Sequence, residues 1–111
     1  MLIDRIVIDC ASIVDFDSLH DAFDAVLGFP EFYGRNMNAW IDCMTSIDEP
    51  DDGMTTHHVA KGVLLRVELL HVAAFAERCP EVHDALAECA AFVNHRRVEV
   101  GEPPVLEVVH V

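Results

Sequence analysis

Short apolar runs and one amphipathic pattern organise the first third of the chain. Residues 3–9 are rich in Ile and Val and too short for a buried helix, so they are predicted to form a buried strand. A first helix is predicted after the acidic and capping residues 15–18, with His20 in its opening turn. Gly28 and Pro30 are typical of a helix that stops and turns. The predicted buried stripe of this helix is Leu19, Phe23, Val26 and Leu27.

A second helix is predicted to begin after Asn36, which is a favourable N-cap residue. One apolar stripe, expected to face the core, consists of Met37, Trp40, Ile41 and Met44. A different face carries an amide, a carboxylate and a hydroxyl on Asn38, Asp42 and Thr45. On spacing alone a solvated helix face is the simpler interpretation of this polar stripe, because surface helices commonly show one.

The turn before this helix contains Phe32, Tyr33 and Gly34. A second glycine so soon after Gly28 predicts either a positive φ or a close approach of the backbone to another group. The two adjacent rings cannot point the same way. One is therefore expected to enter the core, while the other remains available at the surface.

The second half of the chain contains two more strand patterns and two helix patterns. Residues 47–62 include Pro50, Gly53 and an acidic run, which predicts an irregular loop. A strand is predicted over 63–67 and a helix over 68–78. Pro80 starts the next helix at its favoured first position, and a last strand is predicted over 105–111. The inner face of the last helix is predicted to be Val82, Leu86, Cys89 and Val93.

Strands joined by helical crossovers are parallel. The predicted architecture is therefore an α/β fold, in which a small three-stranded parallel sheet packs against about four helices. The length of 111 residues and the apolar fraction of 52% suit a single domain spanning residues 1–111.

Charge narrows the range of possible partners. The chain has 20 Asp and Glu against 7 Lys and Arg, a net charge of −13 at pH 7. Such a surface repels nucleic-acid backbones, so direct binding to nucleic acid is not expected. It would steer the protein toward a basic partner, although the same charge would also serve solubility alone.

Residues 1–10 lack a basic start followed by a long apolar run, and no apolar stretch reaches membrane-spanning length. We therefore expect a cytoplasmic protein without membrane contact. The cysteines form no C-x-x-C pair and are expected to be reduced thiols, mostly in the core. They are Cys10, Cys43, Cys79 and Cys89.

Catalytic and metal-binding motifs are not found. The sequence has no Gly-rich phosphate loop, no H-E-x-x-H and no G-x-S-x-G, so we expect neither an enzyme nor a cofactor. Asp51, Asp52, His57 and His58 match no compact ligand spacing, and adjacent histidines do not readily converge on one ion. No metal site is predicted, and the role of these histidines and of the 47–62 loop stays open.

The segment from Ser18 to Thr45, SLHDAFDAVLGFPEFYGRNMNAWIDCMT, resembles the first half of the barstar family, the small intracellular inhibitors of secreted microbial ribonucleases such as barnase. The matching residues fall in order without a gap. They are Leu19, His20, Pro30, Glu31, Tyr33, Gly34, Asn36, Asp42, Cys43 and Thr45. The second half of the chain agrees with the family in its expected order of elements.

The resemblance implies inhibition by plugging. In the family, the aromatic loop and the polar face of this helix enter the ribonuclease active site, where a helix carboxylate takes the place of a substrate phosphate; Asp42 falls on that position. The resemblance thus implies a basic, barnase-like ribonuclease as partner and an immunity role. The partner-binding residues it implies are Phe32, Tyr33, Gly34, Asn36, Asn38, Ile41, Asp42 and Thr45.

Three residues depart from the family pattern. Phe32 stands in place of a second tyrosine, Asn38 in place of an aspartate, and Trp40 precedes Ile41 where the family has an aliphatic residue and then Trp. Asp48, in the acidic flank beyond the helix, is expected at the rim of the interface. The alternative function is a non-catalytic acidic interaction module that binds another basic cellular protein.

Overall fold

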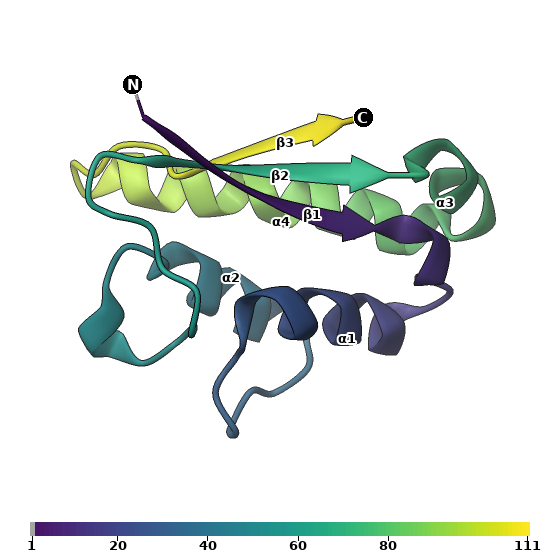
Figure 1. The fold of residues 1–111 in the computed structure, drawn as a ribbon, viewed down its shortest axis with the longest axis horizontal. Coiled ribbons are helices and arrows are strands. Elements are labelled where there is room, and N and C mark those ends of the chain that lie inside the picture. The colour runs from purple at the N-terminus through teal and green to yellow at the C-terminus, as the bar shows by residue number, and fades with distance from the viewer. Residues whose placement is uncertain (1) are drawn as a thin grey trace.

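The structure is a computed structural model that describes residues 2–111. These residues form three strands, four α-helices and two short 3₁₀ turns, in the predicted order of one strand, two helices, one strand, two helices and one strand. Figure 1 shows the arrangement. The strands are β1 (Ile3–Asp9), β2 (Leu64–Leu70) and β3 (Leu106–His110), and the helices are α1 (Phe16–Leu27), α2 (Met37–Thr45), α3 (Val72–Arg78) and α4 (Pro80–Glu99).

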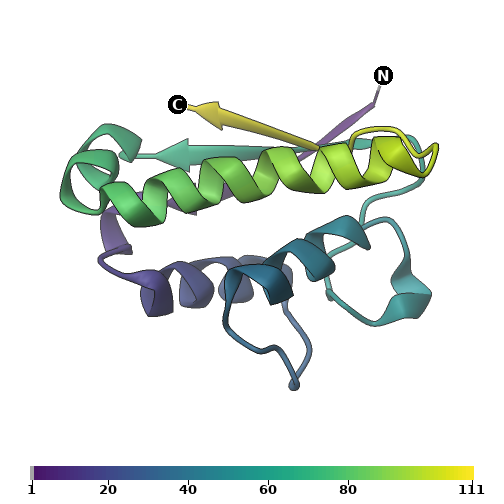
Figure 2. The ribbon, with the colours of Figure 1, turned by 180° about the vertical axis from the view of Figure 1, so that it is seen from behind.

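The three strands form a parallel sheet in the order β1-β2-β3. The long helix α4 runs along the sheet and packs against β3, as Figure 2 shows from behind. Helix α1 packs against β1, and α2 packs against α4. The predicted α/β fold with a small three-stranded parallel sheet and about four helices is therefore confirmed.

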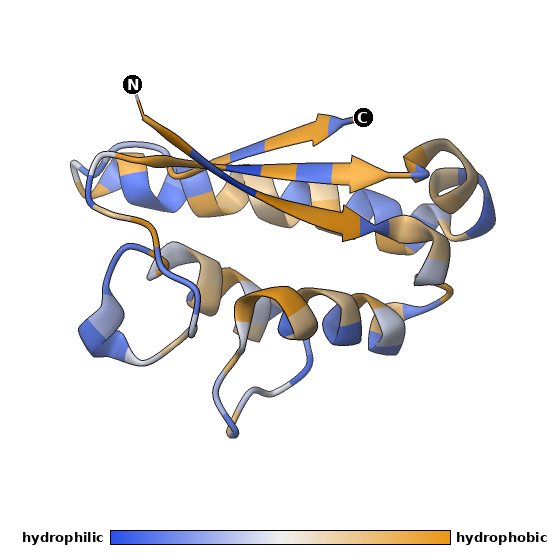
Figure 3. Ribbon diagram, in the orientation of Figure 1, coloured by the Kyte–Doolittle hydropathy of each residue, from blue (hydrophilic) through white to orange (hydrophobic). Residues whose placement is uncertain are grey.

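The core lies between the sheet and the helices. Apolar residues from every strand and helix contribute to it, among them Ile8, Phe23, Trp40, Leu65 and Phe75, each at most 1% exposed. Figure 3 shows the strands as largely hydrophobic and the 3₁₀ turn at Pro50–Asp52 as hydrophilic. Burial of the core side chains supplies most of the folding free energy.

The second strand is longer than predicted, and the predicted helix over 68–78 is wrong at residues 68–71, because the strand continues to Leu70 and α3 begins at Val72. Leu69 fits both a helical stripe and the alternation of a strand, so sequence spacing does not decide between them. The structure pairs Ile8 with Leu69 in the sheet, and Leu69 is 2% exposed. His71 has a positive φ of 57° and separates the strand from the shorter helix α3.

The first helix begins earlier than predicted. It starts at Phe16, because Asp15 caps it by accepting a hydrogen bond from the Ser18 N–H at 2.8 Å. The Ser18 hydroxyl completes a capping box with Asp15. His20 therefore lies in the second turn, and Val26, predicted to be buried, is 38% exposed.

Candidate functional site

Helix α2 begins after Asn36 and turns its apolar side toward the core, as its sequence predicts. The Asn36 side chain accepts a hydrogen bond from the Ala39 N–H at 2.8 Å, which fixes the helix start. Trp40, Ile41 and Met44 of the apolar stripe are buried and Met37 is half-buried, while Asn38 and Asp42 are exposed on the opposite side. Ile41 is only 8% exposed and belongs to the core. The structure therefore does not bring Ile41 to the surface with the other predicted contact residues.

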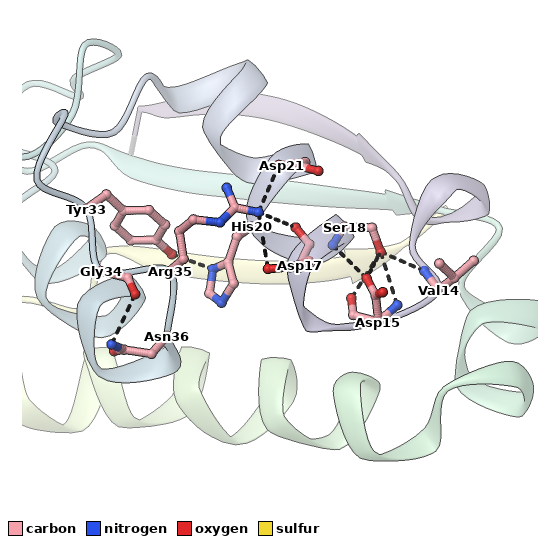
Figure 4. Close-up of polar contacts among 10 residues, drawn as sticks. All are labelled: Val14, Asp15, Asp17, Ser18, His20, Asp21, Tyr33, Gly34, Arg35 and Asn36. Atoms are coloured by element: carbon pink, nitrogen blue, oxygen red, sulfur yellow. Dashed lines mark hydrogen bonds and ion pairs between the residues drawn. The ribbon is translucent and has the colours of Figure 1, made fainter.

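The turn before α2 presents one aromatic ring and anchors the other. Phe32 is 75% exposed. Tyr33 is half-buried against Phe29, with 4.3 Å between the ring centroids. The Tyr33 hydroxyl is hydrogen-bonded to Nδ1 of His20 at 2.6 Å, as Figure 4 shows. The two rings thus separate as expected, one toward the interior and one into solvent.

His20 supports this turn from beneath. Its side chain is 1% exposed, and burial, followed by the charge of Arg35, lowers its pKa below the ordinary value of 6.5. The imidazole is therefore neutral near pH 7. Its Nε2 has no hydrogen-bond partner among the described residues. The burial of His20 and its contact with Tyr33 give this histidine a packing role.

Arg35 ties the turn to helix α1, a role that the sequence did not indicate. Its guanidinium donates to the backbone oxygen of Asp17 and to Oδ1 of Asp21, each at 2.9 Å (Figure 4). Arg35 also carries the positive φ of the turn, 52°, which was one of two alternatives predicted for Gly34. At Gly34 the close approach applies instead, since a Cβ there would lie 3.1 Å from Nδ2 of Asn36.

The carboxylate of Asp42 is paired within the molecule. Oδ1 accepts a hydrogen bond from Nη1 of Arg96 on α4 at 2.9 Å, and the two side chains remain 56% and 41% exposed. Thr45, one turn further on, donates its hydroxyl to the Ile41 carbonyl at 2.6 Å. The polar stripe of α2 is therefore exposed at Asn38 and Asp42 and half-buried at Thr45.

A shallow hollow of about 360 Å³ lies beside Asp42. It is lined by Asp42, Thr45, Ser46, Asp52, Met54 and Arg96. The tip of the 47–62 loop therefore borders the polar stripe of α2 through Asp52 and Met54. This places a further carboxylate near Asp42 at the edge of the candidate site.

Asp48 does not lie at a rim, contrary to expectation. It is 4% exposed and accepts two hydrogen bonds from Arg97, from Nη1 at 3.0 Å and from Nη2 at 2.8 Å. Burial alone would raise the pKa of Asp48, but the hydrogen bonds and charge of Arg97 outweigh it and lower the pKa below 3.8. Arg96 and Arg97 thus make separate ion pairs, one exposed and one buried.

Backbone hydrogen bonds join the 47–62 loop to the end of α1. The Thr56 N–H donates to the carbonyls of Leu27 and Gly28, both at 2.9 Å, and the His57 N–H donates to Leu27 at 3.0 Å. The His57 ring pairs with Asp4, and His58 contacts Thr55. Within residues 2–111, no three His, Cys, Asp or Glu side chains are grouped to hold a metal ion.

The four cysteines are unpaired, and three of them are buried. Burial, with smaller contributions from the charges of Asp9 and Asp42 respectively, raises the pKa of the Cys10 and Cys43 thiols to about 11. These thiols therefore remain protonated at neutral pH. Cys43 lies on the buried side of α2, so it supports the candidate site without contributing surface to it.

Comparison with known proteins identifies the family to which the chain belongs. The family model described as "Barstar (barnase inhibitor)" matches residues 3–107. This chain belongs to the barstar family. A protein of Bacillus subtilis (strain 168), named "Putative ribonuclease inhibitor YrdF", is 40% identical over 47 residues, which cover 41% of this chain. The chain spans about half, 52%, of the length of that curated relative.

The family description names an inhibitor and not an enzyme. In the described part of the chain, no helix has both the length and the apolar character needed to cross a membrane.

Proposed function

We propose that this protein inhibits a basic, barnase-like microbial ribonuclease by placing the exposed turn and the polar face of α2 in the enzyme's active site. The observation that carries the proposal is the position of Asp42, a carboxylate that is 56% exposed on a capped helix, and this helix follows the turn that exposes the ring of Phe32. The family match over residues 3–107 supports the same role.

The electrostatics of the two proteins would be complementary. A ribonuclease binds phosphate through lysine, arginine and histidine side chains, and a fixed carboxylate pairs with such cations through short, charge-assisted hydrogen bonds. The net charge of −13 would also accelerate the encounter with a basic enzyme at low salt. Asp42 therefore takes the role of a substrate phosphate in this proposal.

The turn before α2 contributes a contact surface that is already ordered in the free protein. Tyr33 is held by His20, and Arg35 by Asp17 and Asp21, so little ordering of the turn is left to occur on binding. Pre-organisation of this kind lowers the entropic cost of association. Phe32, Asn36 and Asn38 complete the proposed contact surface around Asp42.

The proposed setting is the cytoplasm of the cell that makes the enzyme, where the inhibitor would confer immunity. Four unpaired cysteines suit a reducing compartment. An inhibitor with this location would protect the cell's own RNA from enzyme that has not yet been secreted.

The test is titration of the protein into a barnase activity assay, together with Asp42→Ala and, as a control for charge, Asp84→Ala. Asp84 is 69% exposed and contacts its neighbour His83 on α4. We expect Asp42→Ala to weaken binding by about 2–5 kcal/mol, mainly through faster dissociation, because it leaves the enzyme's cations unpaired. Asp84→Ala should change affinity little.

Rate constants at low and high salt decide between a buried and a peripheral carboxylate. If Asp42→Ala slows only association, and that effect disappears in high salt, Asp42 lies at the periphery of the interface. The proposal that Asp42 enters the active site is then wrong. If no ribonuclease in a broad panel of barnase-like enzymes is inhibited, the proposed function is refuted.

A further inference from the structure

Arg96 is a partly exposed cation beside Asp42, the carboxylate of the proposed contact surface. It lies on α4, which packs beside α2 (Figure 2), and its neighbour Arg97 points inward to Asp48. Arg96 pairs with Asp42 at 2.9 Å while remaining 41% exposed. A partner that approaches Asp42 therefore meets Arg96 as well.

This ion pair competes with the proposed complex. Arg96 already donates to Oδ1 of Asp42, so an enzyme guanidinium that binds both carboxylate oxygens must share Oδ1 with Arg96 or displace it. Because Arg96 lies beside Asp42, its charge stays close to the enzyme's cation in either case. Two like charges brought together in a desolvated interface repel each other and oppose binding.

We infer that Arg96 is a specificity-determining residue, and that the target ribonuclease carries an acidic side chain beside the cation that binds Asp42. In the complex, the internal Asp42–Arg96 pair is exchanged for two intermolecular pairs of the same kind. The protein then discriminates against ribonucleases whose active-site rim is basic throughout. This inference rests on the proposed function.

Carboxylates of this chain offer Arg96 alternative positions. Asp52 lines the hollow that Arg96 shares with Asp42, and Glu49 and Glu99 line a second hollow of about 490 Å³ on its other side. Glu49 contacts Lys61 and Glu99 contacts His95, so both already have a basic neighbour. Asp52 has no ion pair among the described residues, so it is the competitor within the chain, and an enzyme carboxylate must bind Arg96 in preference to Asp52.

The test measures affinity for barnase, used as the probe, and for barnase variants in which each Lys or Arg at the rim of the active site is changed singly to Glu. The inhibitor forms are the unmodified protein, Arg96→Gln, and Arg5→Gln as a matched control. Arg5 loses the same charge, but it pairs with Glu68 in the sheet and is 69% exposed there. Both substitutions are also made in an Asp42→Asn background.

We expect Arg96→Gln to bind unmodified barnase about 3- to 10-fold tighter than Arg5→Gln does, on the scale of an exposed ion pair with added like-charge repulsion. For one rim variant of barnase the preference should reverse, so that the protein with Arg96 binds it tighter than Arg96→Gln does. In the Asp42→Asn background, the gain from Arg96→Gln on unmodified barnase should be smaller, because no Asp42–Arg96 pair then has to be broken and only the like-charge repulsion remains.

Three results would count against the inference. If barnase is inhibited but Arg96→Gln binds no tighter than Arg5→Gln, Arg96 finds a carboxylate within its own chain, and the inference is overturned while the proposed function stands. The same conclusion follows if the gain from Arg96→Gln is not reduced in the Asp42→Asn background. If no inhibitor form binds barnase or any rim variant, the inference is overturned, and the proposed function fails as well only if the panel of barnase-like enzymes is not inhibited.

Discussion

Replacement of Arg97 by Met should be among the most destabilising single substitutions in α4. Arg97 is 4% exposed and donates four hydrogen bonds, two to the Asp48 carboxylate and one each to the carbonyls of Thr45 and Pro103. These contacts join α4 to the end of α2 and to the segment before β3. Arg97→Met removes all of them and leaves Asp48 buried.

The magnitude follows from that buried charge. Removing one partner of a buried ion pair costs about 3–5 kcal/mol, because the other charge remains uncompensated. Lys61 lies 3.7 Å from Oδ2 of Asp48 and is 57% exposed, so it offers partial compensation. We therefore expect a loss of about 3 kcal/mol, a large share of the roughly 5–15 kcal/mol by which domains of this size are stable.

Urea unfolding followed by fluorescence suits this measurement, since Trp40 is the one tryptophan and is buried beside Phe23. With an m-value near 2 kcal/mol/M, the midpoint for Arg97→Met should fall by roughly 1.5 M. The matched control is Arg96→Met, which removes an exposed pair on the same helix and should cost about 1 kcal/mol or less. Equal midpoints for the two variants would refute the reasoning, because they would show that Asp48 is compensated or reaches solvent.

Two further predictions concern the turn and the loop. Because burial lowers the folded pKa of His20, the unfolded chain binds more protons between that value and 6.5, so the free energy of unfolding should fall as pH drops below about 6.5. Unfolding curves from pH 5 to 8 should show a weaker pH dependence in His20→Gln, and parallel profiles would contradict the assignment. Ala is strained by about 1–2 kcal/mol at both Gly28 and Gly53, where φ is 66° and 65°. Only at Gly28 would a Cβ meet Thr56, at 2.6 Å, so Gly28→Ala should be the less stable variant by at least about 1 kcal/mol in the same urea assay, and equal losses would show that Thr56 moves aside.

Elements with a local sequence signal were predicted well. The N-cap at Asn36, the stop at Gly28 and the start at Pro80 depend on a few adjacent residues, and the structure places a helix boundary at each. The first strand was predicted with the bounds that the structure shows, Ile3–Asp9. The end of β2 was missed because Leu69 satisfies two periodicities, and only pairing with the distant β1 selects the strand.

For the candidate contact residues, too, local geometry can be read from the sequence and contacts between helices cannot. The exposed sides of Phe32, Asn38 and Asp42 follow from helical and turn geometry within one segment. The pairing of Asp42 with Arg96 joins residues on different helices, so spacing along the chain carries no signal for it. The expectation that Asp48 lies at the rim was wrong for the same reason, because its burial depends on the contact with Arg97 from α4.

The central position of β2 also governs the order in which the molecule can form. Its two neighbours in the sheet are separated from it along the chain by pairs of helices, so each parallel pairing closes a long loop before it gains any contact energy. During synthesis, β1 and the proposed contact helix α2 emerge well before the strand and the helix against which they pack. The contact surface therefore acquires its fixed geometry only late in folding, when α4 has docked and Arg97 has closed onto Asp48.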